Sequence, residues 1–121
     1  MNTNYKNLIV WQKSIQLVKE IYIIVSKFPK EEKYWLVDQI KRCVVSIPSN
    51  IAEWHERNYN SEIIRFLYIS KGSTAELETQ LIISKELWFI DEKEYQKVSE
   101  KIIEILKMLS KLISNKKNLK T

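Results

Sequence analysis

Turn-forming residues are almost absent from this chain, and their scarcity limits the folds that it can adopt. One glycine and two prolines occur in 121 residues. A β-sheet protein needs such residues at its many chain reversals, so the composition argues against an all-β fold. The balance of 45% hydrophobic and 29% charged residues is that of an ordinary globular domain. The length predicts a single domain over residues 1–121.

Apolar residues recur at spacings of three and four over four long segments, which is the periodicity of amphipathic helices. We expect helices at about residues 8–27, 31–56, 61–88 and 91–114, followed by a frayed tail at 115–121. The last helix has a heptad-type apolar seam. Four helices with short connections predict an all-α, antiparallel up-down-up-down four-helix bundle.

A proline falls inside the second helical segment. Pro48 removes one backbone donor and clashes with the carbonyl of Val44. The segment is then either one kinked helix or two helices that break at Ile47, with Ser49 or Asn50 as the second cap. We predict one helix kinked at Pro48, because the apolar spacing continues in phase across the proline.

Small residues cluster in the middle of the third helical segment, at Ser70, Gly72, Ser73 and Ala75. Glycine inside a helix lowers its stability. We therefore expect another backbone to approach the helix closely at this point.

Residues that build catalytic and metal sites are too few in this chain. With His55 as the single histidine, the paired Glu-x-x-His motifs of di-metal bundles and histidine-rich zinc sites cannot form. We interpret His55 as structural, near a helix end, and Cys43 as a small buried hydrophobic residue. No glycine-rich loop is present to hold a phosphate. We expect no catalytic residue, no metal and no cofactor, and a protein that is not an enzyme.

The single cysteine excludes an internal disulfide, which is typical of a reducing compartment. The start of the chain lacks a secretory hydrophobic region, and the apolar run 21–25 is too short to cross a bilayer. We therefore expect a cytoplasmic protein without a membrane partner.

A polar line and a mixed line run beside the apolar seams of the second and third helices. The polar line is Ser46, Asn50, Glu53 and Arg57, and the mixed line is Phe66, Ser73, Glu76 and Gln80. In a hairpin that turns near residues 58–60, Glu53 lies close to Arg65, so it can pair with Arg57 or Arg65. The lines form either a half-buried network that sets helix register or a ligand or nucleic-acid pocket. We favour the network.

The net charge of +5 belongs to the first and last segments of the sequence. Such a basic surface can attract polyanions, or it can be a solvated lysine-rich face. The candidate nucleic-acid residues are Lys6, Lys13, Lys93, Lys97, Lys101, Lys107 and Lys111, with Lys116, Lys117 and Lys120 adding to the positive excess. Most aromatic residues fall on the apolar seams, so we expect phosphate contacts rather than base stacking.

Several short motifs occur together and in order. They are Leu8-Ile-Val-Trp-Gln-Lys13, Phe28-Pro29, Gln39-Ile-Lys-Arg42, Ser46-Ile-Pro-Ser-Asn-Ile-Ala-Glu53, Arg65-Phe-Leu67 and Gly72-Ser-Thr-Ala-Glu-Leu-Glu78. Over about residues 5–114 the chain resembles the four-helix-bundle proteins encoded in intervening sequences of bacterial 23S ribosomal RNA genes. The resemblance implies a bundle that assembles as a ring-like homopentamer, in a family not known for enzymes. The chain also resembles accessory proteins of diversity-generating retroelements, which are basic pentamers that bind nucleic acid and the reverse transcriptase.

The resemblance also singles out a set of shared polar positions, which in this chain are Asn50, Glu53, Arg57, Arg65 and Glu76. The chain departs from the family at Trp54 and Glu56, where relatives usually have glycine. We expect the second helix to continue to its end here, and the indole of Trp54 to fill a groove that is open in relatives.

Apolar positions on more than one face of the first helix, together with Tyr5, Trp11, Tyr22 and Trp88, predict self-association, because soluble monomers rarely expose so large an apolar area. Three functions fit these observations. The first is an oligomer that binds RNA or DNA, with ribosomal RNA as the first candidate. The others are a structural or protein-interaction module without nucleic acid, and an accessory subunit of a reverse transcriptase.

Overall fold

The computed structural model describes residues 4–118, which contain helices and connecting turns and no strand. The four long helices are α1 (Ile9–Val25), α2 (Asp38–His55), α3 (Asn60–Glu86) and α4 (Glu92–Lys117). A 3-10 turn, η1 (Tyr5–Asn7), precedes α1, while the turns η2 (Lys30–Glu32) and η3 (Lys33–Val37) precede α2. In the described residues, no helix combines the length and the apolar composition that crossing a membrane requires.

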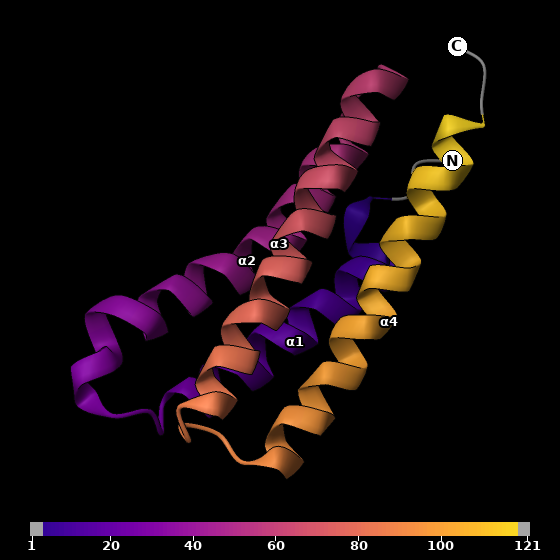
Figure 1. Ribbon diagram of the computed structural model, residues 1–121. Helices are drawn as coiled ribbons and strands as arrows, with labels where there is room; N and C mark the ends of the chain where they lie inside the picture. The colour runs from indigo at the N-terminus through magenta and orange to yellow at the C-terminus, as the bar shows by residue number, and fades with distance from the viewer. Residues whose placement is uncertain (1–3, 119–121) are drawn as a thin grey trace.

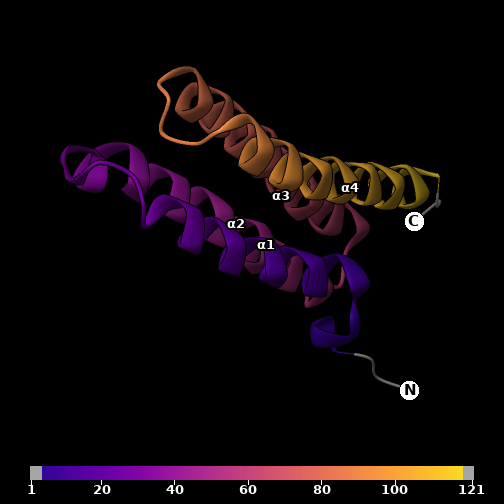
Figure 2. The same cartoon turned by 90° about the horizontal axis from the view of Figure 1, so that it is seen from below.

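Each helix packs against its neighbours in sequence, and α4 closes the bundle against α1 (Figure 1). The most extensive contact joins α2 to α3. Figure 2 shows two layers, one formed by α1 and α2 and the other by α3 and α4. The structure confirms the predicted all-α up-down bundle.

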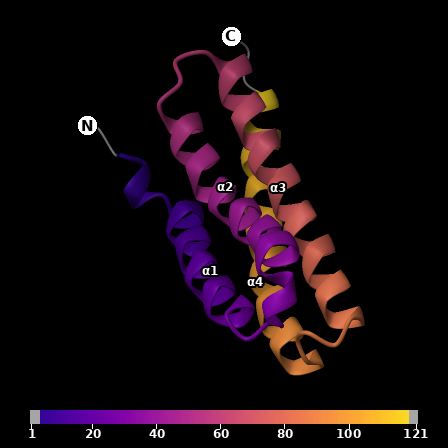
Figure 3. The same ribbon diagram turned by 90° about the vertical axis from the view of Figure 1, so that its left-hand side faces the viewer.

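The two ends of the bundle carry different connections. The start of α1, the α2–α3 connection and the end of α4 lie together at one end, here called the α2–α3 end (Figure 3). The α1–α2 and α3–α4 connections lie at the other, here called the α3–α4 end, where the rings of Phe28 and Phe89 pack 5.4 Å apart.

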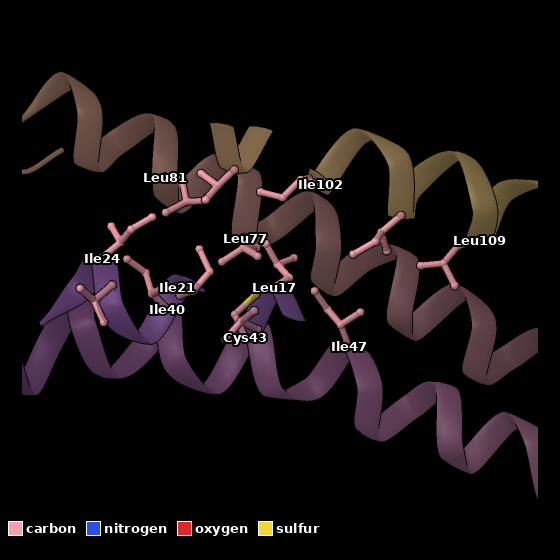
Figure 4. Packing of buried hydrophobic residues seen from close by; sticks show 14 of the residues in the cluster. Leu17, Ile21, Ile24, Ile40, Cys43, Ile47, Leu77, Leu81, Ile102 and Leu109 are labelled. Carbon is pink, nitrogen blue, oxygen red and sulfur yellow. The ribbon is translucent and has the colours of Figure 1, made fainter. Parts of the chain in front are cut away.

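The core is built from aliphatic side chains that repeat at helical spacing. Leu17, Ile40, Leu77 and Ile102, one from each helix, are fully buried (Figure 4). Burial of one such side chain contributes roughly 1.5–3 kcal/mol to folding. These residues therefore hold the four helices around one common core.

Pro48 lies in the middle of α2, which continues through it without a break. The alternative of two helices broken at Ile47 is therefore wrong. Proline cannot donate to the Val44 carbonyl, but hydroxyl groups satisfy the carbonyls beside it. Ser49 Oγ donates to the Val45 carbonyl at 2.9 Å, and Ser70 Oγ donates from α3 to the Ile47 carbonyl at 3.3 Å.

The second helical segment begins differently from the prediction. The α-helix starts at Asp38 rather than near residue 31, and the π-helical turn η3 precedes it. A π-turn inserts one residue into the helical repeat. Leu36 and Val37 are both buried there, while Tyr34 and Trp35 are exposed. The wider turn thus lets two adjacent apolar residues reach the core.

The last helix extends past the predicted end at residue 114, because α4 continues to Lys117. Ile113 is buried, and Asn60 Nδ2 donates to the Lys116 carbonyl at 2.8 Å. These two contacts hold the last turn against α3, so the predicted frayed tail is wrong for residues 115–117. Residues 119–121 of that predicted tail lie outside the described part of the chain.

Gly72 lies on the outward side of α3. Apart from its chain neighbours and the adjacent backbone of α3, no atom of the described residues lies within 4 Å of the place where a Cβ would stand. The close backbone approach expected here does not occur within the chain. The small residues that do serve packing are Ser70 and Thr74, which are fully buried.

Trp88 ends α3 in the left-handed backbone conformation, with φ of 66°. The Phe89 amide donates to the Ser84 carbonyl at 2.9 Å, and the Trp88 amide donates to the Lys85 carbonyl at 3.0 Å. This pattern is a Schellman motif, in which glycine usually takes the position of Trp88. The tryptophan side chain is 91% exposed, so no burial within the chain offsets the strain.

Candidate functional site

The polar line and the mixed line predicted from the sequence meet where α2 packs against α3. The hydroxyls of Ser46 and Ser73 share a hydrogen bond of 2.7 Å. Cys43 Sγ donates to the Ser73 carbonyl at 3.0 Å. Asn50 turns back instead, and its Nδ2 donates to the Ser46 carbonyl of its own helix at 2.8 Å. Short polar side chains thus join the two helices along this seam.

Cys43 is buried in the same seam and confirms the prediction of a small buried residue. Burial, together with the nearby carboxylate of Glu76, raises the pKa of its thiol to about 12. The thiol therefore stays protonated at neutral pH, which suits a donor and not a nucleophile.

Glu53 pairs with Arg57 in the same helix, one of the two partners expected from the sequence. The guanidinium of Arg57 also lies 4.7 Å from the centre of the Phe66 ring, and that of Arg65 lies 5.6 Å from it. Arg65 makes no ion pair with another residue of the described chain. The hairpin therefore brings two arginines together around one aromatic ring.

The five shared polar positions do not form a single connected network. Glu53, Arg65 and Glu76 are exposed, whereas Asn50 and Arg57 are partly buried. The side chains of Glu53 and Arg57 remain 52% and 37% exposed. These groups lie on an open face of the α2–α3 hairpin and do not enclose a pocket.

Three ion pairs connect α1 and the turn that follows it to α4: Lys13 with Glu104 at 3.1 Å, Lys101 with Glu20, and Lys27 with Glu94 at 3.3 Å. Lys13, Glu20 and Lys27 stand seven residues apart and alternate in charge, and this spacing is visible in the sequence. Sequence reasoning missed this signal. Lys13 and Lys101, which were predicted to contact nucleic acid, are engaged in holding the bundle.

The remaining candidate lysines are exposed and fall into two groups. Lys93 and Lys97 lie in the first turns of α4, near the α3–α4 end. Lys107 and Lys111 lie in its second half, and Lys6 lies in η1, which also belongs to the α2–α3 end. Lys120 lies outside the described residues.

The last turns of α4 bring positive charge to the α2–α3 end, because no acidic residue follows Glu104 in the sequence. The acidic residues at this end are Glu53, Glu56 and Glu62, which flank the α2–α3 connection. Lys116 and Lys117 lie in the last turn of α4, which contacts the start of α3. The Lys117 ammonium lies 5.0 Å from the centre of the Tyr68 ring. This end therefore presents cations from the α2–α3 connection, α3 and α4, namely Arg57, Arg65, Lys116 and Lys117.

Two exposed tyrosines stand at this basic end, and sequence reasoning missed both. Tyr59 precedes α3 and is 70% exposed, and Tyr68 on α3 is 43% exposed. Tyr59 falls in the predicted loop, and Tyr68 falls off the apolar spacing of the third helix. Both positions lie off the apolar seams, which indicates exposed side chains, although most aromatic residues of the chain lie on the seams.

The outward side of α3 carries a row of exposed apolar side chains. They are Ile69, Ile82, Ile83 and Leu87. Gly72 and the exposed Ala75 lie between them and leave the middle of the row flat. Within residues 4–118, no cluster of histidine, cysteine or acidic residues has the arrangement to hold a metal ion.

The sequence matches the family model of the 23S rRNA-intervening sequence proteins over residues 6–111. This chain belongs to that family. Its structure is similar to that of a protein of unknown function from the S23 ribosomal protein family of Bacteroides thetaiotaomicron VPI-5482. The TM-score is 0.79 and the identity 24%, over 87% of this chain and 98% of the other. This likeness shows the shared fold, and no curated protein matches the chain.

The family match confirms the resemblance to the intervening-sequence proteins, while the relation to retroelement accessory proteins stays a prediction. At the place where we expected relatives to have glycine, α2 continues to His55 and Trp54 is buried. The indole forms one wall of an apolar groove together with Leu8, Met108 and Leu112. Trp54 therefore joins η1 and α4 to the end of α2.

Proposed function

We propose that this protein is a non-enzymatic, cytoplasmic helical bundle that assembles with copies of itself and binds nucleic acid through the α2–α3 end. Ribosomal RNA is the first candidate ligand, because the description of the family refers to 23S rRNA. The observation that carries the proposal is the grouping of exposed basic side chains over the second half of α4 and the α2–α3 end, where they take no part in the ion pairs between α1 and α4.

Positive side chains on a common surface bind polyanions by neutralising phosphates and releasing counterions. Lys107 and Lys111 are exposed, and neither forms an ion pair with another residue between positions 4 and 118. A ring of several copies would repeat this surface, which raises the local positive potential further.

Binding of a short fluorescently labelled RNA, followed by anisotropy over a range of salt concentrations, tests the proposal. The affinity is expected to fall steeply with salt. The double variant Lys107→Glu/Lys111→Glu is expected to bind more weakly with an unchanged helical circular dichroism spectrum. Lys101 is unsuitable for this test because its ion pair with Glu20 holds α4 to α1.

The matched control reverses Lys93 and Lys97, which are also exposed but lie near the α3–α4 end. Equal weakening by both double variants would show that binding follows total charge and not this end of the bundle. Absence of binding at about 50 mM salt, where phosphate contacts are strong, would favour a protein-interaction module instead.

Self-association is supported by the exposed apolar row on α3, which a second copy of the chain can cover. The flat centre at Gly72 and Ala75 allows another helix to approach closely. Cyclic symmetry buries such a face between like protomers. The number of five copies comes from the family resemblance.

A further inference from the structure

Tyr59 and Tyr68 stand on the proposed nucleic-acid surface with much of each ring open to solvent. The ring of Tyr68 already meets a cation, the ammonium of Lys117 at 5.0 Å. A flexible lysine on an exposed aromatic face is easily displaced, since such a contact is weak at an exposed site. A base can then stack on the Tyr68 ring, while the Lys117 ammonium contacts a phosphate.

Arginines extend this arrangement across the α2–α3 connection. Arg57 and Arg65 both lie against the ring of Phe66, at 4.7 and 5.6 Å from its centre. The guanidinium of Arg65 is exposed on the outer side, and guanidinium planes stack on bases as well as contacting phosphates. Aromatic faces and cations therefore alternate along the start of α3.

The exposed aromatics at the opposite end of the bundle have different surroundings. Trp88 lies between Glu86 and Asp91, and Tyr34 follows Glu31 and Glu32, with the ammonium of Lys33 5.4 Å from the centre of its ring. Acidic neighbours repel phosphates. The α2–α3 end differs in the last turns of α4, which add Lys111, Lys116 and Lys117 and no acidic residue.

We propose that the α2–α3 end binds single-stranded nucleic acid, with bases stacked on Tyr59 and Tyr68 and with the neighbouring lysines and arginines on its phosphates. This inference rests on the proposed function and names the form of nucleic acid that the surface takes. A duplex keeps its bases stacked inside, whereas an unpaired strand can place them on exposed aromatic rings.

The test compares three labelled probes of equal length: a single-stranded RNA, the corresponding duplex, and an abasic strand with the same number of phosphates. The full-length protein is expected to bind the single strand about tenfold more tightly than the abasic strand, because only the former can stack. The abasic strand separates stacking from charge.

Two variants locate the effect, Tyr59→Leu and Tyr68→Leu. Leucine keeps the apolar contacts and suits a helix, but it offers no face for a base. Each variant is expected to lose several-fold in affinity for the single strand, with unchanged affinity for the abasic strand and an unchanged salt slope. The matched control is Tyr34→Leu, since Tyr34 is 85% exposed and distant in the fold.

The outcomes separate the two proposals. Equal binding of all three probes, with wild-type behaviour of both tyrosine variants, would overturn base stacking and leave the proposed function standing. If the variants lose affinity for the single strand and the abasic strand equally, base stacking is also overturned. The tyrosines would then maintain the structure of the surface and would not contact bases. Absence of binding to every probe would overturn both proposals.

Discussion

Ser46 Oγ and Ser73 Oγ lie 2.7 Å apart, in the middle of the largest helix contact of the bundle. The Ser46 hydroxyl also lies 2.8 Å from the Cys43 carbonyl, so it has a second acceptor within its own helix. Apolar contacts alone tolerate sliding of one helix along another. This pair of hydroxyls, 27 residues apart in the chain, favours one register of α2 against α3.

The first prediction concerns this pair. Ser46→Ala leaves the partly buried Ser73 hydroxyl without its partner and is expected to lower the free energy of unfolding by about 1 kcal/mol. Ser73→Ala is expected to cost less, because Ser46 keeps the Cys43 carbonyl. Urea denaturation of both single variants and the double variant measures the coupling. Strictly additive effects would show that the two hydroxyls act independently.

The second prediction concerns the Glu53–Arg57 pair. Both side chains are substantially exposed, so Glu53→Ala is expected to lower the free energy of unfolding by about 0–1 kcal/mol. Arg57→Ala is expected to cost more, because it also removes the contact with Phe66. Thermal unfolding of the two variants checks the order. A loss of several kcal/mol in Glu53→Ala would indicate that the pair becomes buried in an assembly.

The third prediction concerns the end of α3. Trp88→Gly is expected to raise the free energy of unfolding by about 1 kcal/mol, because glycine adopts the left-handed conformation without steric strain. Leu87→Gly, one residue earlier at a negative φ, is expected to destabilise and serves as the control. Urea denaturation compares them. If Trp88→Gly destabilises the protein, the indole makes a stabilising contact beyond the single chain.

The fourth prediction concerns assembly through α3. Gly72→Leu meets open space within the chain and replaces glycine by a better helix former, so the bundle is expected to keep or gain stability. The larger side chain is expected to prevent a second helix from packing there, which shifts the protein toward monomers in light scattering. Wild-type protein that is monomeric at micromolar concentration would contradict the proposed self-association, and unchanged assembly of the variant would exclude this face.

The fifth prediction concerns the pH dependence of stability. The pKa of Cys43 is raised from 9.0 to about 12 in the folded protein, so the unfolded thiol loses its proton first as the pH rises. The contribution of the protonated Cys43 thiol to the free energy of unfolding is therefore complete below pH 9 and is lost progressively between pH 9 and 12. The difference in unfolding free energy between wild type and Cys43→Ala is expected to shrink over that range. A constant difference would contradict the raised pKa.

The apolar periodicity and the lack of turn residues determined the four helices and their up-down order. These are local properties, because a stripe at helical spacing must be covered by another stripe and short connections make neighbours antiparallel. The continuity of α2 through Pro48 also followed from the spacing alone. The π-turn before Asp38 did not follow from the spacing, because it places two adjacent apolar residues, Leu36 and Val37, in the core that all four helices form.

The roles of the charged and aromatic residues were decided only by the tertiary structure. Lys101 and Lys107 look alike in the sequence, yet only Lys101 faces an acid on α1. Which cation meets a carboxylate depends on the axial offset and rotation of two antiparallel helices, and these are set by the packing of the whole core. The same offset brings the end of α4 to the start of α3, where Lys117 meets Tyr68, although 49 residues separate them in the chain.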